Sequence, residues 1–469
     1  MLLALRSSVK KVRTDERVRF TTICAAFLAA FFIMFRYLFN QLSYPVLFCI
    51  VVLLVLRRVA HFKIDLSDYF WFVYALIMVT FGLVRDDQEL AVKRFILLVM
   101  MIVIKIILQS DFQKWRDVLY RFLVIFGLIQ AFGIFCDVVF PSITQAFRSV
   151  ANANTEYGDY LKTYSSAVYR LGFTNQAGVA GFCITCLCCV CAVRYIQAEG
   201  RRKTLHLILL TIGVFSLLLT GKRALFVEAL FSFFLIAFIY YSGTKQKGTK
   251  FFIAGFIVIA LFAIIASQPV FAANVDRLLN GDDAGRAEIW EYLINNFKSS
   301  PLVGVGKDVF ASQVDMGAHN EYLKVLSENG LLGFSFFILA LITPLIEIAV
   351  AIIKNRKLLG LVNMSDQKDI IFDLLISVAF QVIIILYSFT GNPLTSPDQT
   401  LAYFIFTAIG IGSIRRLYIY ARSISKSSIP SIEQRSNNEW NLYRGTNALL
   451  PEHAAPALPP ASTTQSPRR

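Results

Sequence analysis

The stretch LLGFSFFILALITPLIEIAVAII occupies residues 331–353 and carries a single charged residue, Glu347. It is long enough to cross the hydrocarbon core of a bilayer, which takes about 20 helical residues. A backbone inside the bilayer must satisfy its own hydrogen bonds, so this stretch is predicted to be helical. The whole chain has the same character, because 56% of its 469 residues are hydrophobic and 16% are charged. A soluble domain would carry charge on roughly a quarter of its residues.

Other apolar runs of similar length predict an all-α, polytopic membrane protein with about twelve transmembrane helices. The sequence contains no ten-residue stretches that alternate between apolar and polar residues, as the strands of a membrane β-barrel would. The expected spans are residues 20–39, 42–56, 68–84, 91–108, 118–139, 174–196, 205–220, 223–241, 250–267, 331–353, 370–390 and 400–417.

The net charge of +15 is spread over short connections between the spans. This distribution follows the positive-inside rule, so it predicts membrane topology and no nucleic-acid partner. Both termini are expected on the cytoplasmic side of the membrane. The basic N-terminus runs directly into a full-length span, so no cleavable signal peptide is expected. Two longer loops, residues 140–173 and 268–330, then lie on the periplasmic side; the second has apolar spacing typical of helices around residues 287–297 and from Tyr322.

Two domains are expected from composition. Residues 1–423 form the polytopic membrane domain, which includes the extracytoplasmic loop 268–330. Residues 424–469 are rich in Ser, Pro, Ala, Asn and Thr and end in ALPPASTTQSPRR. Such a segment buries too little apolar surface to fold, so it is interpreted as a disordered cytoplasmic tail.

The eight cysteines all fall inside expected spans. No His, Asp or Glu lies among them, so we interpret them as small buried hydrophobic residues and expect neither a metal site nor disulfides. The sequence also lacks a Walker-type phosphate loop, paired zinc-ligand spacing and a nucleophile-elbow serine, so no cofactor is expected. Five of the cysteines are clustered: Cys183, Cys186, Cys188, Cys189 and Cys191.

His319 is the one histidine of four that the predicted topology places on the periplasmic face. Imidazole is the side chain best suited to accept and return a proton near neutral pH, so His319 is a candidate catalytic residue. A lone loop histidine is more often a surface or capping residue. The residues around it strengthen the catalytic interpretation, because Asn320, Tyr322 and Glu328 lie on the same short segment above the membrane and are candidates to bind substrate.

Basic residues on the same face are the second feature. Arg223 opens a span after Thr220-Gly221-Lys222, and Arg286 lies in the long loop, four residues before Trp290. A guanidinium grips phosphate oxygens with two parallel hydrogen bonds and keeps its charge. Either arginine could instead lie at the lipid headgroups, and Lys222 is an alternative phosphate ligand to Arg223.

These residues together describe a site at the outer membrane surface, with cations for an anionic lipid head and a base for a hydroxyl. Aromatic residues, among them Trp290, Tyr292, Tyr157 and Tyr160, are candidates to stack on sugar rings. The combination suits glycosyl transfer from a lipid-linked diphosphate sugar. No metal is required, because the basic side chains can stabilise the departing diphosphate.

The residues also resemble a known family. His319-Asn320, nine residues, Gly330, two residues and Gly333 are similar to the pattern H-[N/S/Q]-x9-G-x-x-G of the O-antigen ligase family. The resemblance implies a C-type membrane glycosyltransferase that takes a glycan from undecaprenyl diphosphate without metal or ATP. It further implies that Arg223 and Arg286 hold the diphosphate and that His319 serves the acceptor. The segment Gly285–Trp290 and the arginine that follows Thr220-Gly221 resemble the same superfamily.

Alternatives remain at this point. A ligase would transfer the glycan to lipid A–core, whereas a polymerase of the same superfamily would transfer it to another polyprenyl-linked repeat. A non-catalytic assembly scaffold is a third possibility. A polysaccharide transporter would need charges along a path through the spans. The charged residues within or near the expected spans are Arg36, Lys105, Asp137, Glu228, Glu347 and Asp373, and most of them lie at span ends.

Overall fold

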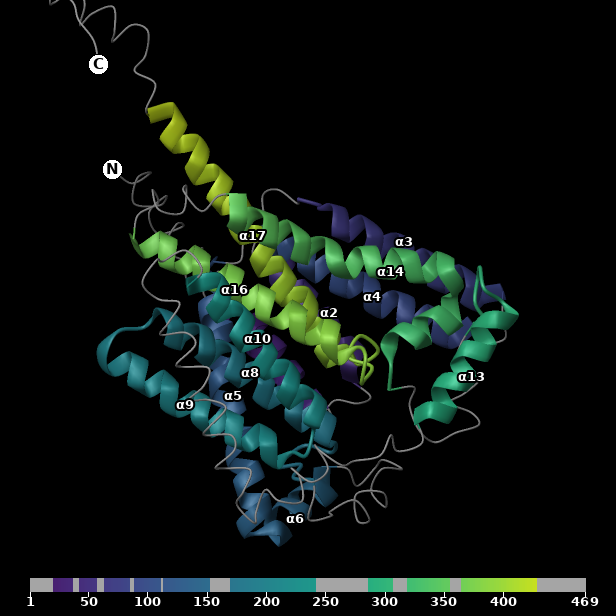
Figure 1. Cartoon of the computed structure of the whole chain (residues 1–469), viewed down its shortest axis with the longest axis horizontal. Coiled ribbons are helices and arrows are strands. Elements are labelled where there is room, and N and C mark those ends of the chain that lie inside the picture. The colour runs from purple at the N-terminus through teal and green to yellow at the C-terminus, as the bar shows by residue number, and fades with distance from the viewer. Residues whose placement is uncertain are drawn as a thin grey trace, which may run out of the picture. The chain divides into compact units, whose positions relative to one another are not determined.

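The computed structural model describes residues 20–36, 42–56, 63–84, 88–110, 113–151, 169–241, 286–306, 319–354 and 364–427. In these ranges the regular structure is helical and no strand occurs, which confirms the all-α class (Figure 1). The helices are Phe20–Phe35, α2 (Ser43–Val55), α3 (Leu66–Val84), α4 (Gln88–Leu108), α5 (Gln113–Val139), α6 (Pro141–Ala151), α8 (Ala177–Gln197), α9 (Gly200–Leu219), α10 (Arg223–Tyr241), α13 (Arg286–Ser299), α14 (Glu321–Lys354), α16 (Met364–Tyr387) and α17 (Pro397–Ser427).

Eight of the described helices are long and apolar enough to cross a membrane: α3, α5, α8, α9, α10, α14, α16 and α17. The helix Phe20–Phe35 and α2 are apolar but shorter. The expected span 250–267 and residues 428–469 of the expected tail lie outside the described residues. The protein is therefore a polytopic helical membrane protein, and the total of twelve spans stays a prediction.

Two helices appear where the sequence analysis expected loops. The loop expected at residues 140–173 contains α6, a short amphipathic helix. The loop expected at residues 268–330 contains α13 and the first turns of α14, as the apolar spacing predicted. Gly330 is not helical (φ 61°), so α14 consists of a short helix from Glu321 and a long helix after the kink, and the long helix agrees with the span expected at residues 331–353.

The helices differ in how deeply they lie in the protein. In α8, α16 and α17, 78% of the residues in the span are buried, against 28% in α3 and α9. The five clustered cysteines lie in α8 and are buried, which agrees with their interpretation as small hydrophobic residues. Small residues let the helices approach closely: a Cβ atom on Gly213 of α9 would lie 2.6 Å from the Cys188 sulfur.

Contacts between the helices bring distant segments together. The helix α3 packs against both α4 and α14, and α10 packs against α16 and α8. Figure 1 shows α13 beside the first part of α14, in agreement with their contacts. The chain divides into two compact units, residues 1–417 and 418–469, and the described part of the second unit is the end of α17.

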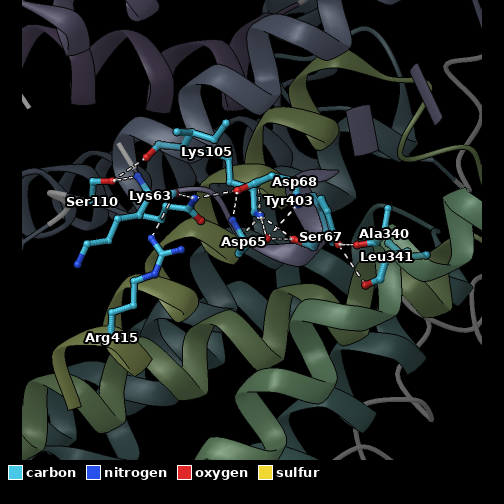
Figure 2. A network of polar contacts seen from close by, with 12 residues as sticks. Lys63, Asp65, Ser67, Asp68, Lys105, Ser110, Ala340, Leu341, Tyr403 and Arg415 are labelled. Carbon is cyan, nitrogen blue, oxygen red and sulfur yellow. Dashed lines mark hydrogen bonds and ion pairs between the residues drawn. The ribbon is translucent and has the colours of Figure 1, made fainter. Parts of the chain in front are cut away.

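The charges inside the helical unit are mostly paired. Lys105 is fully buried, and its ammonium lies 2.9 Å from the Asp65 carboxylate and 2.5 Å from that of Asp68 (Figure 2). Lys105 lies in the last turn of α4, near a span end as expected, and the carboxylates at the start of α3 compensate its charge inside the protein. Arg116 likewise pairs with Asp369 (2.6 Å) and Asp373 and joins α5 to α16.

Two more of the charges considered for a transport path are engaged in the same way. Arg36 pairs with Asp398 (3.4 Å), and Asp137 pairs with Arg148 (2.9 Å). Removing one partner of a buried ion pair is costly because the other charge is left uncompensated. These charges therefore hold helices together, which weakens their interpretation as a transport path.

Candidate functional site

The first turn of α14 positions His319. Asn320 caps the helix, because its side-chain oxygen accepts a hydrogen bond from the backbone N–H of Leu323 (3.1 Å). His319 immediately precedes this cap and has φ 49°, the one positive φ of a non-glycine residue in the described part of the chain. Such a conformation is uncommon for a side chain and persists where the surroundings enforce it. The backbone at His319 is thus held in a defined conformation just before the start of α14.

The connection between α16 and α17 wraps around the next residue, Glu321. The backbone N–H of Glu321 donates to the carbonyls of Ser388 (2.8 Å) and Gly391 (3.1 Å). Its buried carboxylate accepts hydrogen bonds from the N–H groups of Leu394 (3.2 Å) and Thr395 (3.3 Å) and from the Thr395 hydroxyl (2.8 Å). These hydrogen bonds fasten the connection between α16 and α17 to the first turn of α14 and so hold the backbone next to His319 in place.

Two of the predicted cations act directly on the histidine. The pKa of His319 is lowered to about 4, first by burial and then by the positive charges of Lys222 and Arg286. The imidazole is therefore neutral at neutral pH. The structure thus brings together three predicted site residues from three places: the turn before α10, the start of α13 and the start of α14. Arg223, beside Lys222 in the sequence, is not among the charges that act on His319.

Lys222 is packed over the small residues of α8. A Cβ atom on Gly181 would lie 3.4 Å from the Lys222 Cβ, and one on Gly178 would lie 3.2 Å from the Tyr387 hydroxyl and 3.7 Å from the Lys222 Cε. The charge of Arg286 also acts on the Tyr387 hydroxyl. Tyr387 therefore lies beside the same cations, and the sequence analysis did not single it out. Its neighbour Gly391, whose Cβ would lie 2.7 Å from the Tyr387 ring, was the available signal.

Helix N-termini strengthen the positive potential. Arg223 is the first residue of α10, and Arg286 is the first residue of α13. The first N–H groups of a helix have no acceptor within the helix and carry the positive end of its dipole. An arginine or lysine at such a terminus adds a full charge to an existing anion site.

The segment after α13 fixes this helix against the kink of α14. The N–H groups of Val305 and Gly306 donate to the carbonyls of Ser327 (2.8 Å) and Glu328 (2.9 Å). In the other direction, the N–H of Leu331 donates to the Pro301 carbonyl (2.8 Å). At the other end, Ile289 and Leu293 of α13 form a small core with partly buried Trp290, Tyr292 and Leu323. Both contacts hold Arg286 near His319.

The arginines at this end fall into two groups. Arg36 pairs with Asp398 (3.4 Å), and Arg94 pairs with Glu328 (3.3 Å). Among the described residues, no carboxylate lies within ion-pair distance of Arg223 or Arg286. These two charges are thus compensated by no acidic side chain in that part of the chain, which suits an anionic ligand.

Most of the predicted substrate-binding residues make contacts within the protein that hold the helices around the site. Asn320 is the helix cap, and Glu328 pairs with Arg94. The Tyr322 hydroxyl donates to the Ile385 carbonyl (2.7 Å), and its ring packs on Phe389. Trp290 packs beside Ile289 and Leu293 on α13, and within the described ranges its indole N–H has no hydrogen-bond partner.

Two predicted features remain to be placed. Tyr157 and Tyr160 lie outside the described residues. Glu228 is buried one and a half turns into α10, and its carboxylate accepts a hydrogen bond from the Thr390 hydroxyl (3.3 Å).

Comparison with known proteins identifies a family for part of the chain. Residues 207–338 match a protein-family model described as O-antigen ligase. The matched range contains Lys222, Arg223, Arg286 and His319. Comparison with curated proteins finds no match. The resemblance of the chain to the O-antigen ligase superfamily is thereby confirmed.

Proposed function

Because residues 207–338 are of the O-antigen ligase type, we propose that the protein is a glycosyltransferase of the bacterial inner membrane. It transfers a glycan from undecaprenyl diphosphate to an acceptor hydroxyl at the periplasmic face, and we favour an O-antigen ligase with lipid A–core as acceptor. The observation that carries the proposal is the convergence of Lys222 and Arg286 on His319, whose imidazole they help to keep neutral.

The cations serve the donor. In the transfer, the bond between the anomeric carbon and the diphosphate oxygen breaks, and its electron pair leaves with the diphosphate. Lys222 and Arg286 stabilise the negative charge that develops there, as fixed positive groups do at other leaving groups. Arg223, the first residue of α10, is a further diphosphate ligand in this proposal. These side chains supply the charge that a metal ion would otherwise provide.

His319 serves the acceptor. The hydroxyl oxygen forms the new bond to the anomeric carbon with inversion, and the hydroxyl proton passes to the neutral imidazole. A base with a pKa of about 4 is weak. The negative diphosphate, once it lies beside Lys222 and Arg286, opposes their effect and raises the pKa of His319 toward its ordinary value. The base therefore becomes stronger only when the donor is bound.

A polymerase of the same superfamily would break and form the same bonds, with a second polyprenyl-linked repeat as acceptor. A transporter would instead need unpaired charges along the helices. The pairing of Lys105 with Asp65, and of Asp137 with Arg148, supports the enzyme over the transporter. The undecaprenyl donor, the acceptor and the roles of the site residues are all parts of this proposal.

The test is a glycan-transfer assay in cells that lack the gene. They are complemented with the wild type, His319→Ala or His206→Ala, at matched levels in the membrane. His206 is the control because it is a partly buried histidine on α9 that lies away from the site residues in sequence. Lipopolysaccharide is separated on gels, and the lipid-linked glycan is measured in parallel.

We expect His206→Ala to restore the wild-type pattern and His319→Ala to fail. Core lipid without glycan, together with accumulated long polyprenyl-linked chains, establishes a ligase. Core lipid that carries a single repeat identifies a polymerase. Wild-type banding in His319→Ala cells would contradict the catalytic role of His319.

A further inference from the structure

A short segment after residue 168 lies beside the proposed donor site. The backbone N–H of Arg170 donates to the carbonyl of Leu219, the last residue of α9 (3.3 Å). The next residues of the chain form the tight connection that carries Lys222 and Arg223 into α10. Arg170 therefore enters the neighbourhood of the cations from a different part of the sequence.

The residues after Arg170 are fixed by a buried ion pair. The Asp137 carboxylate accepts hydrogen bonds from Arg148 (2.9 Å) and from the backbone N–H groups of Leu171 (2.9 Å) and Gly172 (3.2 Å). Arg148 also donates to the Gly172 carbonyl (2.8 Å). Gly172 has φ 58°, which only glycine adopts readily.

Gln130 of α5 completes this scaffold. Its side-chain amide donates to the Leu171 carbonyl (2.8 Å), and its oxygen accepts from the backbone N–H of Phe173 (3.2 Å). Leu171 and Thr174 are buried, whereas Arg170 is partly exposed. The scaffold therefore presents Arg170 in a nearly fixed position.

The guanidinium of Arg170 has one partner in the described chain. It donates to the backbone carbonyl of Asp137 (3.2 Å). That carbonyl lacks its usual donor within the helix, because the residue four positions on is Pro141, which has no N–H. Arg170 thus caps the end of α5 with one of its five N–H donors. Within the described residues, its other donors have no acceptor.

The charge of Arg170 is not balanced by an acidic side chain. The Asp137 carboxylate is occupied by Arg148, and within the described residues no carboxylate lies at ion-pair distance from Arg170. At this end of the helices, the described arginines Arg36, Arg94 and Arg148 each have a carboxylate partner. The hydrogen bond from Arg170 to the Asp137 carbonyl needs only an N–H donor, which an uncharged side chain could supply. The cap therefore does not explain why the residue at this position is positively charged.

We propose that Arg170, whose backbone is hydrogen-bonded to Leu219 just before the turn that carries Lys222, is a further ligand of the donor diphosphate. This inference rests on the proposed function. A diphosphate diester carries two negative charges and several oxygen acceptors, which a planar guanidinium can grip in pairs. Arg170 contacts the leaving group, and its hydrogen bond to Asp137 holds it in position for that contact.

The experiment measures binding of farnesyl diphosphate, a short polyprenyl diphosphate, to the purified full-length protein by calorimetry. Arg170→Gln keeps an N–H donor for the Asp137 carbonyl but loses the charge, so it separates capping from phosphate binding. We expect binding to be roughly tenfold weaker or worse, since a charge-assisted hydrogen bond is lost. The thermal unfolding midpoint should stay unchanged, and Arg170→Lys should recover part of the affinity. Lys298→Gln, at an exposed lysine of α13, controls for general loss of charge.

A transfer assay assigns the anion. For Arg170→Gln, the KM for the lipid-linked donor should rise while the KM for the acceptor stays constant. A rise in the acceptor KM alone would place Arg170 at acceptor phosphates and overturn the proposal. Loss of binding together with a lower unfolding midpoint would reduce Arg170 to the cap of α5, which also overturns it. Equal binding by wild type and Arg170→Gln would contradict a role of Arg170 in binding the diphosphate but would leave the proposed donor site standing. A wild type that binds no farnesyl diphosphate would contradict the proposed donor site itself.

Discussion

The backbones of Gly304 and Gly330 touch: a Cβ atom on Gly330 would lie 2.5 Å from the Gly304 nitrogen. The same Cβ would lie 2.4 Å from the carbonyl carbon of Leu302. This contact joins the segment that follows α13, which begins with Arg286, to the kink of α14, which begins beside His319. The distance between the proposed phosphate ligand and the proposed base thus depends on two glycines.

Replacing Gly330 by alanine tests this contact, and Gly200→Ala is the matched control. Both glycines have a positive φ (61° and 56°), but a Cβ on Gly200 would meet nothing within 4 Å. The control should lose about 1 kcal/mol from backbone strain alone. Gly330→Ala should lose about 3 kcal/mol, because overpacking against fixed backbone adds to that strain. Thermal unfolding in the same detergent measures the difference, and equal losses would show that the segment moves aside easily.

Lys222→Gln should raise the pKa of His319. In the wild type, burial and the charges of Lys222 and Arg286 lower this pKa to about 4, so the imidazole is neutral above about pH 5. Removing one cation favours the protonated form, so the titration should move upward toward pH 6.5. Lys222→Arg keeps the charge and should titrate like the wild type.

Histidine NMR can follow this titration directly, because the chain has only four histidines. His61, His206 and His453 are replaced by glutamine so that the remaining signal belongs to His319. Adding farnesyl diphosphate to the wild-type background should also raise the pKa, since the ligand carries the opposite charge. An unchanged titration in Lys222→Gln would contradict the proximity of Lys222 to His319.

The substitution Arg286→Lys distinguishes the effect of the positive charge of Arg286 from the effect of its planar guanidinium group. Lysine keeps the positive charge, so the pKa of His319 should stay low, but it cannot form two parallel hydrogen bonds to a phosphate. Glycan transfer should therefore fall at least about tenfold while the His319 titration is retained. Arg286→Gln should lose activity and also raise the pKa. Full activity in Arg286→Lys would rule out a bidentate phosphate contact.

Hydropathy was sufficient to predict the helices, because a span must be both apolar and about 20 residues long. The positive-inside pattern singled out Lys222, Arg286 and His319 as candidates, since basic residues on the other face are unexpected, and the structure brings these three residues together. α6 was missed because its polar sequence contains no long apolar run, and its position depends on the pairing of Arg148 with Asp137.

Other site features could not be predicted because tertiary packing creates them. Tyr387 is the last residue of an apolar helix and becomes notable only where Gly178 leaves room beside Lys222. Arg170 looks like an ordinary interfacial arginine until its backbone hydrogen bond to Leu219 places it beside the end of α9. The burial of Lys105 could not be predicted because its partners, Asp65 and Asp68, lie some forty positions earlier and meet it only in the folded protein.

Asp137→Asn should destabilise the protein and also weaken the donor site. The substitution leaves Arg148, 4% exposed, without its carboxylate, and breaking a buried pair in this way costs about 3–5 kcal/mol. The exposed pair of Lys93 and Glu89 provides the control, because Glu89→Gln should leave the unfolding midpoint unchanged. Farnesyl diphosphate binding should fall as well, since the single amide oxygen of asparagine cannot replace both carboxylate oxygens, which accept from Arg148 and from the backbone N–H groups of Leu171 and Gly172 beside Arg170. Lower stability with wild-type binding would mean that the ion pair supports α5 and α6 only and does not position Arg170.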